Sequence, residues 1–326
     1  MNKYKVITLC ITALVLIFIG WSLDWPILSK IQRISCEKDY SLVNKTIACG
    51  GSDVIKKTGY TKTRLNMVDY VEKSKADGTI TNASVYFRDL EHGPTFGVNE
   101  YEVFAPASLL KLPLAIMYIK INEAKPGLLT HSVVYTIPPE GVAPQPFSPS
   151  KNLEVGKSYS LETLIFHTLV YSDNRAAEIL ISFIDKVEHG SEIFDQTFQE
   201  LGVARGGGYG DESVSVRGYA SLFLLLYNIS YLNPESSEKV LTLLTKVDVD
   251  KGLVNGVPAG VQVAHKFGTR GFSDDTKQFH DCGIVYYPGN PYLLCVMSRG
   301  HDWDQLAGFV AEVSRMMYEE VDSRRL

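Results

Sequence analysis

The sequence predicts an α+β fold in which a five-stranded antiparallel sheet is packed by helices from both ends of the chain. An amphipathic helix and two short strands come first, and three strands with a closing helix come last. A long block of helices lies between these two groups. Strands divided in this way meet in one sheet when the helical block is inserted as a subdomain. We expect the sheet part at 63–100 and 255–326 and the helical part at 101–254, together forming one domain, 63–326.

The composition is that of a globular protein. The chain has 326 residues, of which 45% are hydrophobic and 21% are charged, so it has ample material for a core. The net charge of -5 argues against a nucleic-acid-binding protein, which would normally carry a basic face. The five cysteines lack the spacing of a zinc site. We therefore expect a monomer with no metal, no cofactor and no nucleic-acid partner.

The first 28 residues predict a membrane anchor. Lys3 and Lys5 precede an uncharged apolar run from Val6 to Trp21, which is the pattern of a signal-type segment. Gly20-Trp21-Ser22 is a poor cleavage site, so we expect the segment to be retained. Positive residues stay on the cytoplasmic side, which places the rest of the chain outside the cytoplasmic membrane. The alternative is a protein secreted after cleavage of this segment.

The next segment, 29–62, is polar and weakly patterned, and we interpret it as a stalk. It contains Cys36 and Cys49, for which a disulfide is plausible in an exported protein. Cys282 and Cys295 flank a predicted turn and would face each other across two strands. For this second pair, a disulfide and two buried thiols are equally compatible with the sequence.

The elements of the sheet part follow from periodicity. Apolar residues at helical spacing predict a helix from Thr63 that ends near Asp77-Gly78. A strand is expected at Ala83–Asp89, where Val85 and Phe87 share a face, and a second strand, Thr95–Asn99, follows the turn at 91–94. The remaining elements of the sheet part are strands at Gln262–Gly268, Cys282–Tyr287 and Tyr292–Ser298, and a closing helix at Gln305–Val321.

The helical part is interrupted in two places. Residues 126–158 are rich in proline, glycine and serine and predict a covering loop. Gly206–Gly210 resembles a phosphate loop only in glycine content, since it lacks the lysine and a preceding strand, and we reject that function. A helix is expected from Ser108, and further helices near 161–170, 175–187, 192–201, 216–230 and 235–247.

The segment from Phe104 to Lys111 is the main candidate for chemistry. Pro106 and Ala107 mark a helix entry, and Ser108 and Lys111 are three residues apart on neighbouring positions of one helical face. A serine hydroxyl is a weak nucleophile until a base removes its proton. A lysine serves as that base only when it is neutral, and burial or the positive end of a helix dipole favours the neutral form.

Two further motifs follow in order. Ser172-Asp173-Asn174 comes after an apolar helix, and Lys266-Phe267-Gly268-Thr269 falls on a strand. On their own, Ser, Asp and Asn are common helix caps, and Ser-x-x-Lys occurs by chance. The three motifs together, in this order and on these elements, resemble the class A β-lactamases and penicillin-binding proteins over roughly residues 63–322.

The resemblance implies a three-layer αβα fold of the β-lactamase/transpeptidase type and an acyl-enzyme mechanism without a cofactor. Ser108 would attack a β-lactam or D-alanyl amide, Lys111 would be the general base, and Ser172 would relay a proton toward the leaving nitrogen. Asn174 and Lys266 would bind the amide and the carboxylate of the substrate. Gly268 and Thr269 would line the same site, and the backbone N–H groups of Ser108 and Thr269 would form the oxyanion hole.

Two departures from the family pattern affect the predicted function. Phe267 stands where the family carries a threonine or serine whose hydroxyl helps to bind the carboxylate, although Thr269 lies on the same strand face. The glutamate that activates the deacylating water in class A enzymes has no counterpart in the short segment 202–217. Asp211 and Glu212 are the only acids there and are candidate deacylation bases, with solvated loop carboxylates as the alternative.

These departures leave three functions open. The first is slow β-lactam hydrolysis, the second is a cell-wall D,D-peptidase, and the third is a non-catalytic penicillin-recognising domain. A Ser-His-Asp triad using His265 or His280-Asp281 is a fourth arrangement, but it lacks the Gly-x-Ser-x-Gly turn. The sequence favours acylation of Ser108 over efficient turnover.

Overall fold

The computed structural model describes residues 40–44, 47, 59–136, 146–147, 150–203 and 213–324. The chain divides into two compact units, one of residues 1–39 with 45–53 and one of residues 40–44 with 54–326. Apart from Ile47, all described residues belong to the second unit, and the account below concerns that unit alone. The predicted anchor at 1–28, most of the predicted stalk, and Cys36 with Cys49 lie outside the described residues.

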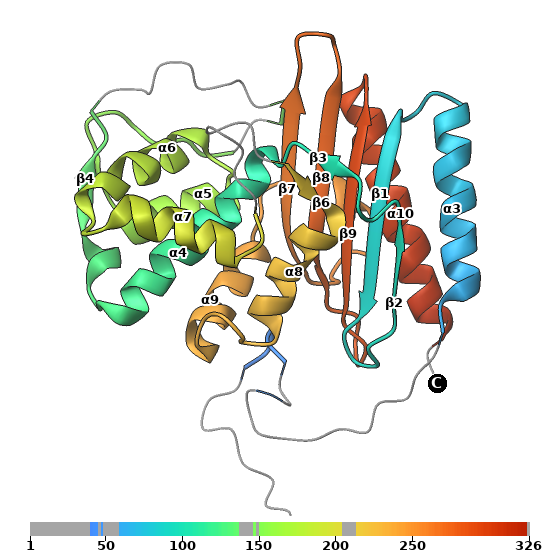
Figure 1. Cartoon of the computed structure of the whole chain (residues 1–326), viewed down its shortest axis with the longest axis horizontal. Helices are drawn as coiled ribbons and strands as arrows, with labels where there is room; N and C mark the ends of the chain where they lie inside the picture. Colours follow the sequence, from blue (N-terminus) through green and yellow to red (C-terminus); the bar gives the residue numbers. More distant parts are fainter. Residues whose placement is uncertain are drawn as a thin grey trace, which may run out of the picture. The chain divides into compact units, whose positions relative to one another are not determined.

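A five-stranded sheet forms the centre of this unit, as predicted (Figure 1). Its strand order is β2-β1-β9-β8-β7, and all four neighbouring pairs are antiparallel. The strands span Thr95–Val98 (β2), Asn82–Asp89 (β1), Tyr292–Gly300 (β9), Lys277–Val285 (β8) and Val263–Gly271 (β7). Strands from the two ends of the chain therefore pair directly, which leaves the intervening helical block as an insertion.

The two terminal helices pack against one face of the sheet (Figure 1). They are α3 (Thr61–Ala76) and α10 (Trp303–Ser323). Val85, Phe87, Leu294 and Val296 point to this face and are fully buried together with Phe309 of α10. One face of β1 and β9 is thus buried beneath the helices, while the continuous apolar run of β9 is also buried on its other face, where α8 packs.

The helical part lies on the other side of the sheet (Figure 1). It contains α4 (Lys111–Ala124), α5 (Leu161–Val170), α6 (Asn174–Phe183), α7 (Gly190–Glu200), α8 (Val216–Tyr227) and α9 (Pro234–Leu244), with the short turns η1 (Ala107–Leu110), η2 (Leu128–Thr130) and η3 (Ile184–Lys186). A fourth short turn, η4 (Gly252–Gly256), packs against α10 instead. Four of these helices begin at side-chain caps, which are Ser160, Asp173, Ser215 and Asn233. Such caps satisfy backbone N–H groups that the first turn leaves unpaired.

The largest differences from the predicted elements concern β8 and two small strand pairs. β8 begins at Lys277, whereas the predicted strand began at Cys282. The prediction missed its first part because Gln278, His280 and Asp281 are polar, although all three are buried. Two three-residue strands, β4 (Ser132–Val134) and β5 (Ser158–Ser160), pair at the ends of the predicted covering loop. A second small pair joins β3 (Val103–Phe104) to β6 (Val214–Ser215). Strands this short show no readable alternation.

Cys282 and Cys295 lie directly opposite each other on β8 and β9 and form a disulfide, with a Cα–Cα distance of 3.9 Å. Both residues are completely buried. The disulfide alternative for this pair is therefore confirmed. Disulfides form and persist in oxidising compartments, so the bond agrees with the prediction that this part of the chain lies outside the cytoplasm.

Residues 40–44 pack against the helical part, although they fall within the predicted stalk. The Glu238 carboxylate of α9 accepts hydrogen bonds from the backbone N–H groups of Ser41, Leu42 and Val43 and from the Ser41 hydroxyl. Leu42 and Val43 are each 2% exposed. This segment is thus a fixed part of the unit that contains the sheet.

Among the described residues, no helix combines the length and the apolar character needed to cross a membrane. The prediction of an anchor concerns residues 1–28, which those residues do not include.

Candidate active site

Ser108 and Lys111 lie together where β3 leads through η1 into α4. Lys111 Nζ is 3.0 Å from Ser108 Oγ. The turn η1 tightens the chain just before α4, with Leu109 N–H donating to Pro106 O at 3.0 Å. Ala107 has φ +50°, a left-handed conformation that is unusual for a residue other than glycine. The predicted nucleophile therefore follows directly after a strained residue, a feature that clusters at functional sites.

The Ser172-Asp173-Asn174 turn between α5 and α6 brings further polar groups to Lys111. Lys111 Nζ donates to the Ser172 carbonyl oxygen and, at 2.5 Å, to Asn174 Oδ1. Asp173 caps α6 by accepting from the N–H groups of Arg175 and Ala176. Ser172 itself has φ +50° and is completely buried. The turn therefore serves both as a helix cap and as a set of partners for Lys111.

Lys266 of β7 completes the cluster. Its Nζ donates to Ser172 Oγ at 2.8 Å and to the Phe267 carbonyl oxygen at 2.9 Å. Lys111 Nζ also lies 3.3 Å from Ser172 Oγ. The Ser172 hydroxyl thus sits between two lysines that come from different parts of the fold. Three segments far apart in the sequence converge on one polar cluster, as the three motifs predicted.

Burial controls the protonation of both lysines. It lowers the pKa of Lys111 to about 7, against the opposing effect of the Asp173 and Glu178 carboxylates. It also lowers the pKa of Lys266 well below its usual value, and the nearby Lys111 charge acts in the same direction. No Asp or Glu of the described part of the chain forms an ion pair with either amine within 4 Å. A neutral Lys111 is therefore accessible near pH 7.

The hydrogen bonds of Lys111 also orient its lone pair. The Ser172 carbonyl oxygen and Asn174 Oδ1 can only accept, so they take two of the lysine N–H groups. When Lys111 is neutral, its lone pair is then directed to the two remaining partners, which are the Ser108 hydroxyl at 3.0 Å and the more distant Ser172 hydroxyl at 3.3 Å. This is the arrangement that a nucleophile and its base require.

Gly268 lets β7 approach the nucleophile segment closely. A Cβ at this position would lie 3.0 Å from Pro106 O and 3.2 Å from Leu109 N. Thr269, next along the strand, is half-buried and pairs with Phe279 of β8. The structure thus places both residues beside the Ser108 segment on the outermost strand of the sheet.

Phe267 belongs to the core. It is 4% exposed, its ring stacks on Phe279 at 6.5 Å between centroids, and Lys266 Nζ lies 4.4 Å from the ring centroid. The apolar core thus occupies the position at which the resembled family has a hydroxyl. Packing in the core thus explains why this position holds Phe267, whose side chain has no hydrogen-bond donor.

The histidine alternative does not form a triad with Ser108. His265 Nδ1 does lie 2.9 Å from Asp281 Oδ1, and both residues are buried. The strand register places this pair on the sheet face that packs against α10, together with Phe267 and Phe279. Lys266, Gly268 and the Ser108 segment lie on the opposite face. The His265–Asp281 pair is instead structural, since Asp281 also accepts from Leu253 N–H at 2.9 Å.

The candidate deacylation bases, Asp211 and Glu212, lie outside the described residues, so their role stays a prediction. The described chain resumes just before β6, where Val214 lies directly opposite Phe104 of β3. In the described residues, no three His, Cys, Asp or Glu side chains gather in the way that would hold a metal ion.

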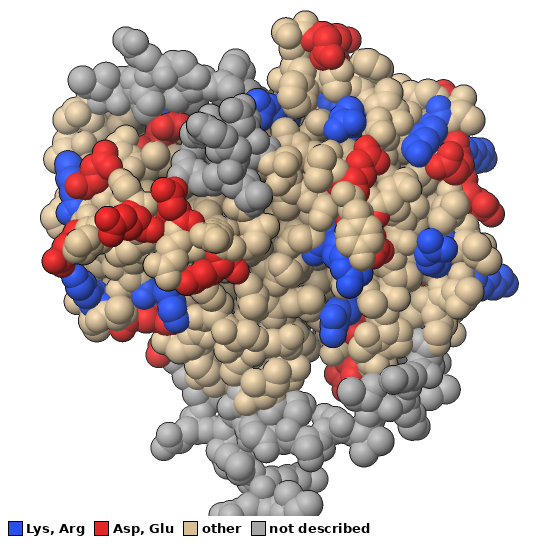
Figure 2. All heavy atoms as spheres, viewed as in Figure 1, with Lys and Arg blue, Asp and Glu red and all other residues tan. Residues whose placement is uncertain are grey.

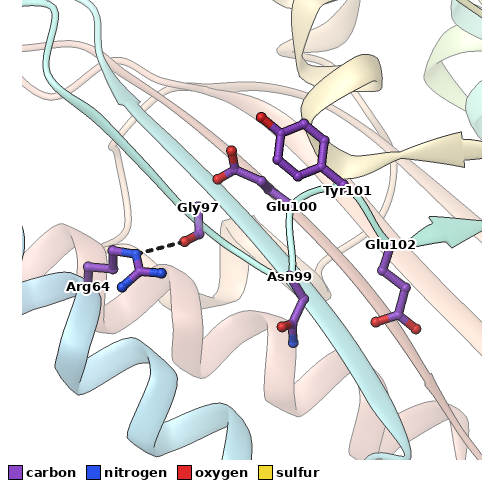
Figure 3. A pocket seen from close by; sticks show the side chains of 6 residues that line it. All are labelled: Arg64, Gly97, Asn99, Glu100, Tyr101 and Glu102. Atoms are coloured by element: carbon purple, nitrogen blue, oxygen red, sulfur yellow. Dashed lines mark hydrogen bonds between the residues drawn. The ribbon is translucent and has the colours of Figure 1, made fainter.

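A separate shallow pocket of about 590 Å³ lies at the β2–β3 connection (Figure 3). Its charged side chains are already paired: Arg64 donates to Gly97 O, Glu100 binds Arg217, and Glu102 accepts from Asn82. On the face seen in Figure 2, acidic side chains gather over the helical part, whereas both charges mix over the sheet. Neither feature competes with the buried lysine cluster as a reaction centre.

Comparison with known proteins agrees with the geometry. The sequence model described as "Beta-lactamase enzyme family" matches residues 61–321. The chain belongs to this family. PER-1, an extended-spectrum β-lactamase of Pseudomonas aeruginosa, is 23% identical over 220 residues, which are 62% of this chain and 70% of PER-1.

Solved structures show the same fold. PBP-A, 21% identical, has a TM-score of 0.69 over 83% of this chain and 100% of its own. An acyl-enzyme complex of a PBP-A mutant with penicillin G, 22% identical, has a TM-score of 0.68 over 83% of this chain and 100% of its own. A class A β-lactamase from Mycobacterium abscessus, 21% identical, has a TM-score of 0.65 over 78% of this chain and 98% of its own. The predicted fold class and family resemblance are both confirmed.

Three buried residues near the site were not predicted. Gln278 and His280 of β8 bond to the backbone of Ala105, and the Tyr219 hydroxyl of α8 donates to Leu109 O at 2.8 Å. Only Phe279 between Gln278 and His280 is apolar, and the flanking Lys277 and Asp281 are charged, so the sequence gives no clear alternation that would reveal these two side chains. Sequence alone could not supply their partner, more than 170 positions away.

Proposed function

We propose that this member of the beta-lactamase enzyme family is a serine hydrolase that opens β-lactam amides through an acyl-enzyme on Ser108. The observation that carries the proposal is the buried Lys111 amine 3.0 Å from Ser108 Oγ, with a pKa lowered by burial to about 7. A base that is partly neutral at the working pH and within hydrogen-bond reach of the nucleophile meets the requirements of general-base catalysis.

The acylation step follows from these contacts. The Ser108 hydroxyl proton passes to neutral Lys111, and Oγ forms a bond to the carbonyl carbon of the lactam. The C–N bond of the ring then breaks, and the nitrogen takes a proton from the Ser172 hydroxyl. Ser172 recovers a proton from the Lys111 ammonium 3.3 Å away, while Lys266 at 2.8 Å stabilises the transient alkoxide. The products are a serine ester with the ring opened and a neutral Lys111.

The substrate contacts are part of the same proposal. Asn174 would hold the side-chain amide of the substrate, and Lys266 its carboxylate. Thr269 shares a strand face with Phe267 and not with Lys266, so the hydroxyl that Phe267 lacks is not replaced there. The N–H groups of Ser108 and Thr269 would stabilise the oxyanion, where such a donor is worth about 3 to 4 kcal/mol. The arrangement of Gly268 against Pro106 and Leu109 supports this, because it holds β7 close to the nucleophile segment.

Slow release of the acyl group is the finer part of the proposal. Water attack on the ester needs a positioned base, which typically contributes about 10²- to 10⁴-fold. The sequence lacks the family's glutamate pattern, and the described residues place no carboxylate within ion-pair distance of Lys111. We propose Asp211 and Glu212 as candidate bases that activate the water for hydrolysis of the acyl-enzyme.

A cell-wall D,D-peptidase is the second candidate function. It uses the same acylation chemistry, and the missing glutamate pattern favours it, because such an enzyme transfers or releases a peptidyl group and has no need to destroy β-lactams. A silent penicillin-recognising domain is not supported, since Ser108, Lys111, Ser172 and Lys266 come together in bonding geometry.

We further propose that the catalytic part works outside the cytoplasm, tethered by the segment at 1–28. The buried Cys282–Cys295 disulfide supports export. Fractionation should find the full-length protein in the membrane pellet. A mature form that begins near residue 23 in the soluble exported fraction would contradict the tether but not the export.

Parallel turnover assays separate the candidate functions. The purified protein is incubated with a chromogenic cephalosporin and with a peptide ending in D-Ala-D-Ala, and the Ser108→Ala variant is the control. A burst with a slow steady rate on the cephalosporin alone supports the β-lactamase, and release of D-alanine supports the peptidase. Reaction with neither substrate in the parent protein would overturn the proposal.

A further inference from the structure

The segment that presents Ser108 is held from the sheet by two buried side chains. Ala105 N–H donates to Gln278 Oε1 at 3.1 Å, and His280 Nε2 lies 3.1 Å from Ala105 O. Both polar groups of one backbone residue, three positions before Ser108, are thus paired with side chains of β8. Gln278 is 3% exposed and His280 is fully buried, so water does not compete for these bonds.

The tautomer of His280 follows from its other contacts. The backbone N–H of Ser298 donates to His280 Nδ1 at 3.4 Å, so the ring proton lies on Nε2 and is available to Ala105 O. Gln278 Oε1 is also 3.2 Å from Nε2. Burial lowers the pKa of His280 to about 4, which keeps the ring neutral and this tautomer in place near pH 7.

The other end of the segment is fixed as well. Tyr219 OH donates to Leu109 O at 2.8 Å from α8, and Gly268 of β7 lies against Pro106 O and Leu109. Between these fixed points lies Ala107 at φ +50°. A strained non-glycine residue persists only where its surroundings over-determine it. The contacts at Ala105 and Leu109 provide that constraint.

We propose that Gln278 and His280 are positioning residues for acylation: their two hydrogen bonds to Ala105 hold the strained Ala107 turn and thereby set Ser108 Oγ against Lys111. The inference rests on the proposed function of Ser108 and adds residues that none of the three motifs contains. They act through the backbone and need not touch the substrate.

The test uses two variants and a matched control in the full chain. His280→Leu removes the donor to Ala105 O, and the milder Gln278→Met removes the acceptor from Ala105 N–H. His280→Gln keeps an N–H donor and serves as the conservative rescue. His265→Leu is the control, because it removes a buried histidine bond of the neighbouring strand on the opposite face, where it does not reach Ala105.

Two measurements are made on the folded fraction of each variant. Hydrogen exchange of peptides spanning 104–110 reports on the two bonds, and time-resolved intact mass after penicillin G reports the acylation rate constant. We expect faster exchange and about 10- to 100-fold slower acylation in His280→Leu and Gln278→Met, since a displacement of about 1 Å can cost 10²-fold. The acylation rate of His280→Gln should recover to within about threefold of the parent rate, and His265→Leu should lower the melting temperature without either effect.

The outcomes separate this inference from the proposed function. Unchanged exchange at 104–110 in both Gln278→Met and His280→Leu would overturn it, even if the parent is not acylated at all. Faster exchange with acylation at the parent rate would overturn the positioning role while the proposed function stands. An equal loss of acylation in His265→Leu would reduce the effect to general destabilisation and so would also overturn the inference.

Discussion

Lys266 Nζ lies 2.8 Å from Ser172 Oγ, so a buried lysine of the sheet directly contacts a buried hydroxyl of the helical part. Lys111 approaches the same hydroxyl at 3.3 Å. A hydroxyl both accepts and donates, and it can therefore take a proton from one amine and deliver it to a leaving nitrogen without rotation of a large side chain. This contact joins the three sequence motifs into one proton path.

The first prediction concerns this hydroxyl. Ser172→Ala and Ser172→Gly should both slow acylation by about 10²- to 10⁴-fold, because each removes the proton relay. Their stabilities should differ, since Ser172 has φ +50°, which glycine adopts without a Cβ penalty. Acylation rates are measured by intact mass and stabilities by urea unfolding. A fast Ser172→Gly variant would show that the backbone turn, and not the hydroxyl, is what the reaction needs.

The second prediction is a pH dependence that arises from Lys111. Burial lowers its pKa to about 7, so the amine gains its proton as pH falls through this value and then cannot accept one from Ser108. Acylation should be near its plateau above pH 8 and should fall about tenfold per pH unit below about pH 6. Rates are taken by intact mass between pH 5 and 9. The residual rate of Lys111→Ala should be far lower and should lack this step. A parent profile that is flat through pH 7 would contradict Lys111 as the base.

The lowered pKa of Lys111 also has a stability consequence with a definite sign. Between the folded value of about 7 and the ordinary 10.5, the unfolded chain binds the proton and the folded chain does not. Unfolding free energy attributable to this group therefore rises with pH across that window. Lys111→Met should be stabilised relative to the parent more at pH 6 than at pH 9.5, as measured by urea unfolding at the two values. A larger stabilisation at pH 9.5 would indicate that the parent amine is charged and favourably paired when buried.

The third prediction concerns the residue that departs from the family pattern. Phe267→Ala should lower the free energy of unfolding by about 3 to 5 kcal/mol, because the ring is 4% exposed and stacks on Phe279. Phe272→Ala, nearby but 38% exposed, should cost no more than about 0.5 kcal/mol. Chemical denaturation of both variants checks this. If both variants lost the same small amount of unfolding free energy, Phe267 would not be packed in the core and would be available to contact substrate.

The sequence was most informative where periodicity or close spacing carried the signal. Val85 and Phe87 revealed β1 by alternation, and the Ser108–Lys111 spacing placed the base beside the nucleophile. The contacts of Ser172 and Lys266, 94 positions apart, were expected only through resemblance to a family. Local spacing carries no information about contacts of this range.

Buried polar residues were the main source of error. Gln278 and His280 gave β8 a polar beginning, so the predicted strand started at Cys282 instead of Lys277. Their partner is the backbone of Ala105, and backbone groups leave no trace in a sequence. Likewise, His265 and Asp281 gave two members of an apparent triad, although strand register puts them on the face away from Ser108. The face of a strand residue is readable only once its register is known.

The fourth prediction concerns the disulfide. Removing it as Cys282→Ser with Cys295→Ser should lower the free energy of unfolding by about 2 to 4 kcal/mol, because the bond closes a loop with a sequence separation of 13. Two hydroxyls would also be buried on the sheet, which adds to the loss. Calorimetry of parent and variant, each with and without reductant, measures the effect. A parent whose melting temperature is insensitive to reductant, and whose two thiols react with a maleimide under native conditions, would contradict the bond.

The central claim is that Ser108 becomes acylated with Lys111 as its base, and intact-protein mass spectrometry after incubation with penicillin G tests it most directly. We predict one adduct of the mass of penicillin on the parent protein, located by peptide mapping to the segment that contains Ser108, persisting for minutes or longer, and absent from a folded Ser108→Ala variant. An adduct on Ser108→Ala, or no adduct on the folded parent at any pH between 6 and 9, would contradict it.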